Sequence, residues 1–130
     1  MDEGCFNLSE LTEKVRSYLE ECLPDMVWDK HYKGASIPSV LTGTVSAGAM
    51  EFEDTVKGAD IAIVTFFIYL IDPTSTNGVD EIAMRVRQAL MDNDTLDDTV
   101  QHGAISKIEF GAITGKAGAC LLTYKVKLWM

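Results

Sequence analysis

One stretch of the sequence, Gly111-Ala-Ile-Thr-Gly-Lys-Ala, carries residue types that bind phosphate in other proteins. A phosphate-binding loop places four residues between its glycines, follows the lysine with Ser or Thr to hold magnesium, and opens a helix. Here three residues separate Gly111 from Gly115, Ala117 follows Lys116, and a strand pattern comes next. The sequence therefore predicts a flexible hairpin tip at this point and no nucleotide site.

A second stretch, Asp92-Asn-Asp-Thr-Leu-Asp-Asp, begins like a calcium-binding loop. Such a loop needs an oxygen ligand at its fifth position, glycine at its sixth and glutamate at its twelfth. The sequence has Leu96, Asp97 and Gly103 at these positions. We expect a solvated acidic loop here, with no more than weak, adventitious cation binding.

The remaining reactive side chains do not form a catalytic set. His31 and His102 are the only histidines, and neither belongs to a metal-binding motif. Cys22 and Cys120 fall on apolar stripes, where a thiol acts as a small hydrophobic group. Because no nucleophile, base and oxyanion donor occur together, we expect a protein that is not an enzyme and uses no metal or cofactor.

The composition is that of one globular domain of 130 residues with a net charge of −9. This charge disfavours specific nucleic-acid binding, which relies on clustered lysine and arginine. No apolar run is long enough to cross a membrane as a helix. The three cysteines lack a CxxC spacing and the N-terminus lacks the pattern of a secretory signal, so we expect reduced thiols in a cytosolic protein.

Two amphipathic helices are predicted. Residues 7–23 repeat apolar side chains at three- and four-residue steps, with Asn7 and Glu10 as a capping box and Pro24 as the stop. A second helix runs from about Val79 to Met91 after a cap at Asn77, with a buried stripe formed by Val79, Ile82, Ala83, Val86 and Leu90.

Four strands are predicted, over residues 36–52, 60–72, 104–112 and 119–130. Residues 25–34 fit either a linker or a short strand. The stretch from Thr44 to Ala59 is rich in glycine and alanine, so we expect a long bent hairpin whose distal part is loosely held, with a turn or mobile loop from Glu53 onward. In the third strand we expect Ile108 and Phe110 to point inward. In the fourth we expect Cys120, Leu122, Tyr124, Val126 and Leu128 on one face and Thr123, Lys125 and Lys127 on the other.

The fold class predicted is therefore two-layer α+β, in the order helix–strand–strand–helix–strand–strand, as a single domain over residues 1–130. Two helices pack on one face of a four-stranded, mostly antiparallel sheet. The strand at 60–72 is apolar on both faces, so a second layer must cover the face that the helices leave open. A partner subunit is the preferred cover, and a sheet that curls over itself is the alternative.

The order of elements, the Gly/Ala-rich stretch before the long apolar strand, and the closing Leu-Leu-Thr-Tyr-Lys-Val-Lys-Leu-Trp together resemble the tail terminator or tail completion proteins of tailed bacteriophages and phage-like particles. The resemblance covers nearly the whole chain as a pattern, without a sharp motif. It implies a homo-oligomeric ring, commonly of six subunits, that caps the tail tube, halts its polymerisation and presents a surface to the head connector. It also implies a place in the virion tail, after assembly in the host cytoplasm, and members of this family can stay monomeric until they dock on the tube.

We expect the interface with other copies or with the tail tube protein to include Phe52, Glu53, Ile63, Phe67, Tyr69, Lys125 and Lys127. The acidic part of the chain up to Asp98 and the basic closing hairpin are candidates for two surfaces that meet head to tail. Two other functions stay open. One is a ferredoxin-like regulatory or ligand-binding module, dimeric through its sheet, and the other is a small enzyme with an unfamiliar site around His31 or His102.

Overall fold

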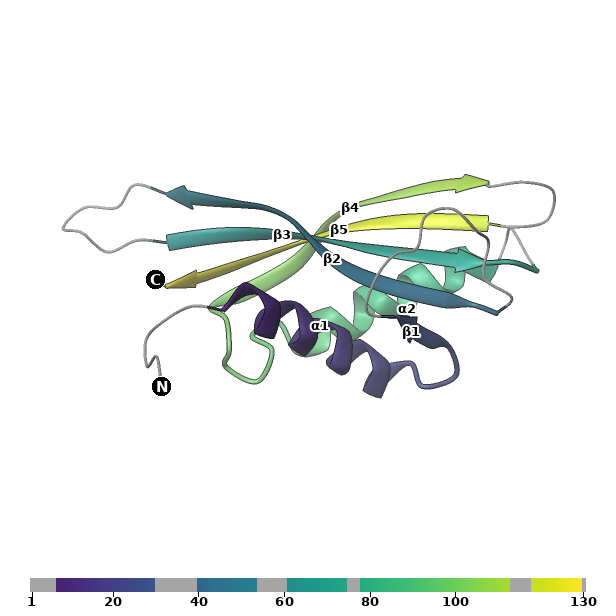
Figure 1. The fold of residues 1–130 in the computed structure, drawn as a ribbon, viewed down its shortest axis with the longest axis horizontal. Helices are drawn as coiled ribbons and strands as arrows, with labels where there is room; N and C mark the ends of the chain where they lie inside the picture. The colour runs from purple at the N-terminus through teal and green to yellow at the C-terminus, as the bar shows by residue number, and fades with distance from the viewer. Residues whose placement is uncertain (1–6, 30–39, 54–60, 75–77, 113–117, 130) are drawn as a thin grey trace.

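The structure is a computed structural model that describes residues 7–29, 40–53, 61–74, 78–112 and 118–129. Both helices lie on the same face of one twisted sheet, so the domain is a two-layer α+β fold (Figure 1). The elements follow one another as α1 (Leu8–Cys22), β1 (Val27–Asp29), β2 (Thr42–Glu53), β3 (Ile61–Asp72), α2 (Gly78–Asp92), β4 (His102–Ala112) and β5 (Gly118–Trp129).

The two helices form as their apolar periodicity predicts. The Asn7 side chain caps α1 by accepting a hydrogen bond from the Glu10 backbone N–H at 3.2 Å. The Tyr18 hydroxyl donates to the Ala89 carbonyl at 2.5 Å and so ties α1 to α2. The buried side chains of α1 are Leu11, Val15 and Leu19, and those of the predicted α2 stripe are Val79, Ile82, Ala83, Val86 and Leu90.

The sheet has five strands in the order β1-β2-β3-β5-β4, which corrects the expected number of four. β1 pairs in parallel with the start of β2, over Val27↔Thr42 to Asp29↔Thr44, and the other pairs are antiparallel. A three-residue strand is too short for an alternating pattern to reveal it, which is why residues 25–34 fitted a linker equally well.

The β2–β3 hairpin is more regular than its composition suggests. Pairing runs from Thr42↔Ile71 to Glu53↔Ile61, with one irregularity between Ala47 and Ala49. The expectation of a loop beginning at Glu53 is therefore wrong for Glu53 itself, and residues 54–60 lie outside the described part. Pairing with the apolar β3 outweighs the low strand propensity of glycine and alanine.

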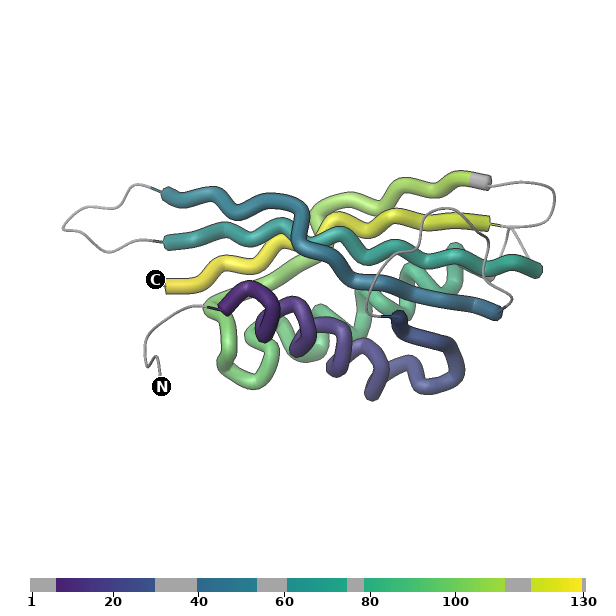
Figure 2. Tube along the Cα trace, in the orientation of Figure 1, coloured from purple at the N-terminus to yellow at the C-terminus, as the bar shows by residue number. Residues whose placement is uncertain are grey.

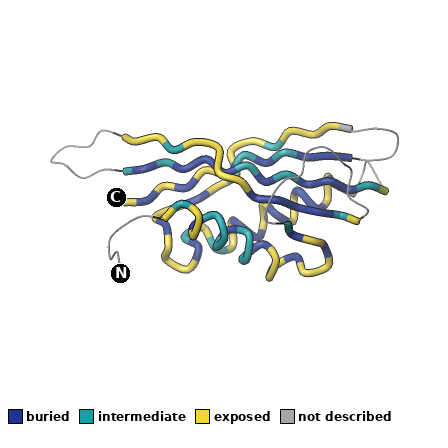
Figure 3. Tube along the Cα trace, viewed as in Figure 1, coloured by how far each residue is buried: buried dark blue, intermediate teal, exposed yellow. Residues whose placement is uncertain are grey.

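The core lies between the sheet and the helices. Alternate residues of β3 enter it, namely Ala62, Val64, Phe66, Ile68 and Leu70 (Figure 3). β5 alternates as predicted, with Cys120, Leu122, Tyr124, Val126 and Leu128 buried and Lys125 and Lys127 exposed. Phe110 was expected to be inward. Its backbone register does place it beside Cys120, yet its side chain is 56% exposed because β4 is an edge strand.

Candidate functional site: the helix-free face of the sheet

The candidate site is the face of the sheet opposite α1 and α2, on which no helix of the described residues lies (Figure 1). We call it the helix-free face. Along β3 it presents four half-buried apolar side chains that are not members of the helix-side core. We call these four residues the apolar stripe: Ile61, Ile63, Phe67 and Tyr69.

Charged side chains border the apolar stripe, with different signs on its two sides. The register places Glu51 of β2 opposite Ile63, and Glu53 opposite Ile61. On the other side of β3, Lys127 of β5 lies opposite Ile63 and Lys125 opposite Thr65. The flank formed by β2 is therefore acidic and the flank formed by β5 is basic.

One ion pair joins these flanks across the stripe. The Lys127 ammonium nitrogen lies 3.9 Å from a Glu53 carboxylate oxygen, and both side chains are about half exposed. Further out, Lys107 and Glu109 of β4 pair at 3.3 Å. Exposed pairs of this kind contribute only about 0–1 kcal/mol each, so they orient the side chains more than they stabilise the fold.

The helix-free face brings together six of the seven residues expected at an interface, which are Glu53, Ile63, Phe67, Tyr69, Lys125 and Lys127. Phe52 is the exception, because its register partner is Ala62 and it therefore lies on the helix side. Its side chain is 62% exposed there. The ends of β2, β3 and β5 extend past the start of α1, so no described helix lies over this part of the helix side (Figure 2).

The other candidate groups from the sequence are placed as follows. His102 is exposed and its Nδ1 lies 3.4 Å from an Asp94 carboxylate oxygen, while His31 lies outside the described residues. Cys22 is exposed, which corrects its expected place in the core, and Cys120 is buried. Burial raises the pKa of the Cys120 thiol to about 11, so it stays protonated at neutral pH.

The acidic stretch after α2 closes on itself. Asn93 accepts a hydrogen bond from the Asp97 N–H at 3.0 Å, and the Thr95 hydroxyl accepts one from the Asp98 N–H at 3.2 Å. Leu96, Asp97 and Asp98 all have positive φ, in the left-handed region. Among the described residues, no group of three or more His, Cys, Asp or Glu side chains is placed to hold a metal ion.

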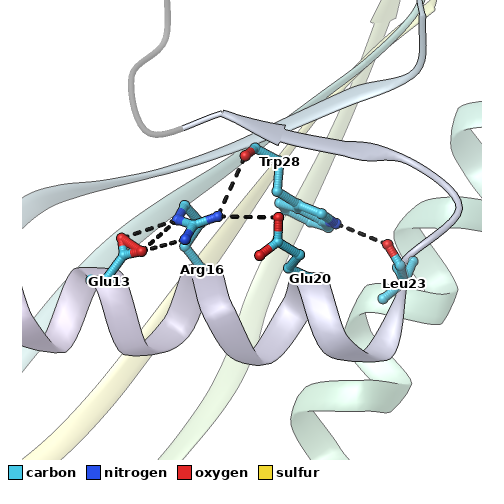
Figure 4. Close-up of polar contacts among 5 residues, drawn as sticks. All are labelled: Glu13, Arg16, Glu20, Leu23 and Trp28. Carbon is cyan, nitrogen blue, oxygen red and sulfur yellow. Dashed lines mark hydrogen bonds and ion pairs between the residues drawn. The ribbon is translucent and has the colours of Figure 1, made fainter.

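The polar contacts around Arg16 and Trp28 have a structural role. Arg16 of α1 pairs with Glu13 and Glu20 and donates to the Trp28 carbonyl of β1 at 3.4 Å, while Trp28 Nε1 donates to the Leu23 carbonyl (Figure 4). The hydrogen bond to Glu13 is the main factor that raises the pKa of Arg16. This cluster ties β1 to α1.

The Tyr124 hydroxyl is fully buried and, within the described part of the chain, has no hydrogen-bond partner. Burial raises the pKa of Tyr124 well above its ordinary value.

A hollow of about 260 Å³ opens near the start of α1, lined by Asn7, Glu10, Leu11, Lys14, Thr99, Val100 and Leu128.

None of the helices that the structure describes is long and apolar enough to cross a membrane.

No known family model and no curated protein matches the chain. Among solved structures, it is similar to a chain of the "Virion of native gene transfer agent (GTA) particle", with 12% sequence identity and a TM-score of 0.48. That similarity covers 94% of this chain and 92% of the other chain, and at this level it does not transfer a function.

Proposed function

We propose that this chain is a structural assembly protein of a phage-like particle. In this proposal it forms a ring, commonly of six subunits, that caps the tail tube, stops tube polymerisation and joins the tail to the head connector. It carries out no chemical reaction and holds no cofactor. Its place is the virion tail, reached after assembly in the host cytoplasm.

The observation that carries this proposal is the apolar stripe on the helix-free face. Ile61, Ile63, Phe67 and Tyr69 lie on one face of a single strand, interrupted by Thr65, with no helix of the described chain over them. An apolar strip rimmed by charged residues is typical of a surface that another protein covers. In a ring, that cover is a neighbouring copy or the tube itself.

The charge distribution supports an assembly in which unlike surfaces meet. Glu51 and Glu53 make the β2 flank acidic, and Lys125 and Lys127 make the β5 flank basic. A head-to-tail contact joins different surfaces of neighbouring copies and closes into a ring when the rotation between copies allows it. Opposite charges at the two flanks favour that arrangement over the contact of two identical flanks.

The experiment is light scattering over a concentration series, alone and with assembled tail tubes from the same genome. We expect a species larger than the monomer, or co-sedimentation with the tubes. Ile63→Asp should weaken association with whichever partner covers the stripe, a neighbouring copy or the tube, by placing a charge among its apolar side chains. Met84→Asp is the matched control, since Met84 is an exposed apolar residue on α2, 51% exposed, in the opposite layer.

Circular dichroism must show that both variants keep the parent fold. A strict monomer at high concentration that also fails to bind tubes would overturn the proposal. A dimer that does not grow with concentration and ignores the tubes would favour a ligand-binding module dimeric through its sheet. Equal weakening by the two variants would show that the apolar stripe is not the surface involved.

A further inference from the structure

Besides the outer edge of the three-residue strand β1, the sheet has two strand edges with which no described strand pairs. β1 covers β2 only from Thr42 to Thr44, so within the described part of the chain the edge of β2 from Ser46 to Glu53 is open. β4 is the last strand on the other side of the sheet. Open edges present unpaired N–H and C=O groups and are templates for pairing with another chain.

The open stretches of these two edges lie at opposite ends of the sheet. At the start of β4, the Gly103 N–H already donates to the Asp94 carbonyl at 2.7 Å, which leaves Ile105 to Ala112 as the open stretch. Following the register from β4 across β5 and β3 to β2, Glu109 lines up with Thr44, and at Thr44 the outer edge of β2 is paired with β1. We call two residues that line up in this way level with each other. The open stretch of β2 begins beyond that level.

Copies in the same orientation can therefore pair only if neighbours are shifted along the strands. β2 and β5 run in one direction and β3 and β4 in the other, so β4 of one copy meets β2 of the next in antiparallel fashion. The register partners of Thr44 and Ala49 on β3 are Tyr69 and Thr65, four residues apart. If the neighbouring copy is shifted by these four residues along the strands, Glu109 lies opposite the partner's Ala49 and the two open stretches face each other. Because four is an even number, side chains on each face of the sheet stay on the same face across the seam.

This shift matches side chains across the seam on both faces. On the helix side, Ile108 comes opposite Met50 of the partner subunit and Ile105 opposite the partner's Phe52. Phe110 comes beside the partner's Ala47. The arrangement covers two large exposed apolar side chains, Phe52 at 62% and Phe110 at 56% exposure, that the monomer leaves in water.

On the helix-free face the same shift places Lys107 opposite the partner's Glu51. Opposite charges in directly facing positions of a strand pair are favourable, and like charges are unfavourable. A stagger between neighbouring strands is also what a closed sheet requires, because its strands tilt relative to the axis of closure. The charge pair supports this register, and the stagger is compatible with closure into a ring.

We infer that the open edge of β4 in one copy pairs with the open edge of β2 in the next copy, antiparallel and with Ile108 opposite Met50 of the partner subunit. The occupant of each edge is thus a second copy of this chain. The inference rests on the proposed self-association and names its seam. It leaves the helix-free face of every copy on the same side of the assembly, where the tail tube can bind it.

Disulfide trapping tests the seam. In a Cys5→Ser, Cys22→Ser background with the buried Cys120 retained, the double variant Met50→Cys/Ile108→Cys is oxidised mildly at associating concentrations. Residues directly opposite in an antiparallel pair have Cα atoms about 4.5–5.5 Å apart, within the range of a disulfide. We expect a ladder of covalent multimers on a non-reducing gel, since each copy links to two neighbours.

The controls separate the register from the existence of an assembly. Glu51→Cys/His102→Cys joins positions that are level within one copy and should give no ladder. A ladder from this pair alone would overturn the stagger, and covalent dimers from Met50→Cys alone would show two-fold pairing and overturn the head-to-tail seam. Light scattering of each reduced variant shows whether it still associates. If the reduced variant associates but forms no ladder on oxidation, this seam is wrong, and the proposed ring is not affected. If the unmodified chain does not associate at all, the result counts against the ring itself.

Hydrogen exchange gives a second readout that needs no substitution. In an antiparallel edge strand, alternate amides point away from the neighbouring strand. For the unmodified chain, we expect alternate amides of Ser46–Glu53 and Ile105–Ala112 to exchange fast at low concentration and to gain protection on association. No gain in either stretch would overturn the seam.

Discussion

Gly48 of β2 lies directly against the ring of Phe67 on β3. A Cβ atom built at Gly48 would stand 2.2 Å from Cε2 and 2.7 Å from Cδ2 of that ring. The contact occurs where the β2–β3 register is irregular, between Ala47 and Ala49. The missing side chain therefore lets the Phe67 ring rest on the backbone of the neighbouring strand, which holds part of the apolar stripe in place.

The first prediction is that Gly48→Ala destabilises the fold by about 1–3 kcal/mol, because the Phe67 ring must leave its position. Denaturant unfolding measures the loss. Gly111→Ala is the matched control, since a Cβ at Gly111 meets nothing within 4 Å and should leave stability within about 0.5 kcal/mol. If Gly48→Ala costs as much in a Phe67→Ala background, the steric explanation is wrong.

The second prediction concerns the buried Tyr124 hydroxyl. Tyr124→Phe should leave stability unchanged or raise it by up to about 1 kcal/mol, because the hydroxyl loses its contact with water and gains no partner among the described residues. Thermal and denaturant unfolding provide the measurement. A loss of more than about 1 kcal/mol would indicate that a bound water satisfies this hydroxyl.

Gly103→Ala extends this test, since a Cβ there would lie 2.6 Å from the Tyr124 hydroxyl oxygen and 2.8 Å from Val126. We expect Gly103→Ala to be destabilising and Tyr124→Phe to recover part of the loss. Equal costs of Gly103→Ala in the two backgrounds would assign the strain to Val126.

The third prediction is that Arg16→Ala destabilises the chain by about 1–3 kcal/mol, since Arg16 bonds two carboxylates and the Trp28 carbonyl. Arg16→Lys should recover only part of this, because an ammonium cannot make the forked contact with Glu13. Trp28 fluorescence reports whether β1 stays docked. An unchanged spectrum and unchanged stability in Arg16→Ala would show that the cluster does not hold β1.

The fourth prediction concerns the basic flank of the helix-free face. Reversing Lys125 and Lys127 to Glu should weaken association most at low salt, and added salt should narrow the gap to the parent because it screens the changed charges. Light scattering at two ionic strengths measures this. Arg85→Glu/Arg87→Glu on α2 is the control with the same change in net charge. If the Lys125/Lys127 variant assembles like the parent at low salt, the opposite charges of the two flanks do not contribute to association.

Local periodicity was sufficient to predict both helices and the faces of β5. The stripe Val79 to Leu90 and the alternation Cys120 to Leu128 are buried as the pattern indicates. The apolar residues on both faces of β3 also predicted a face that the helices leave open. The sequence pattern could not show the order of strands in the sheet, because pairing between distant strands leaves no local signal. It therefore left residues 25–34 open between a linker and a short strand, and it did not show which strand edges are unpaired.

Six of the seven residues expected at an interface lie on one face of the sheet, and Phe52 lies on the other. Phe52 and Glu53 are adjacent in one strand, so their side chains must point to opposite faces, and a strict application of this alternation would have separated them. Phe110 was expected to be buried from its place in the alternation. Alternation gives the face of a residue, whereas burial also depends on which strand lies at the edge.

The length of β1 has a consequence for the size of any ring joined at these edges. In a closed sheet, the number of strands and the stagger together fix the strand tilt and the radius. The three pairs from Val27↔Thr42 to Asp29↔Thr44 decide how far a neighbour can slide along β2 before it meets β1. In a ring joined in this way, these three residues of β1 would limit the stagger between neighbouring copies and so set the circumference.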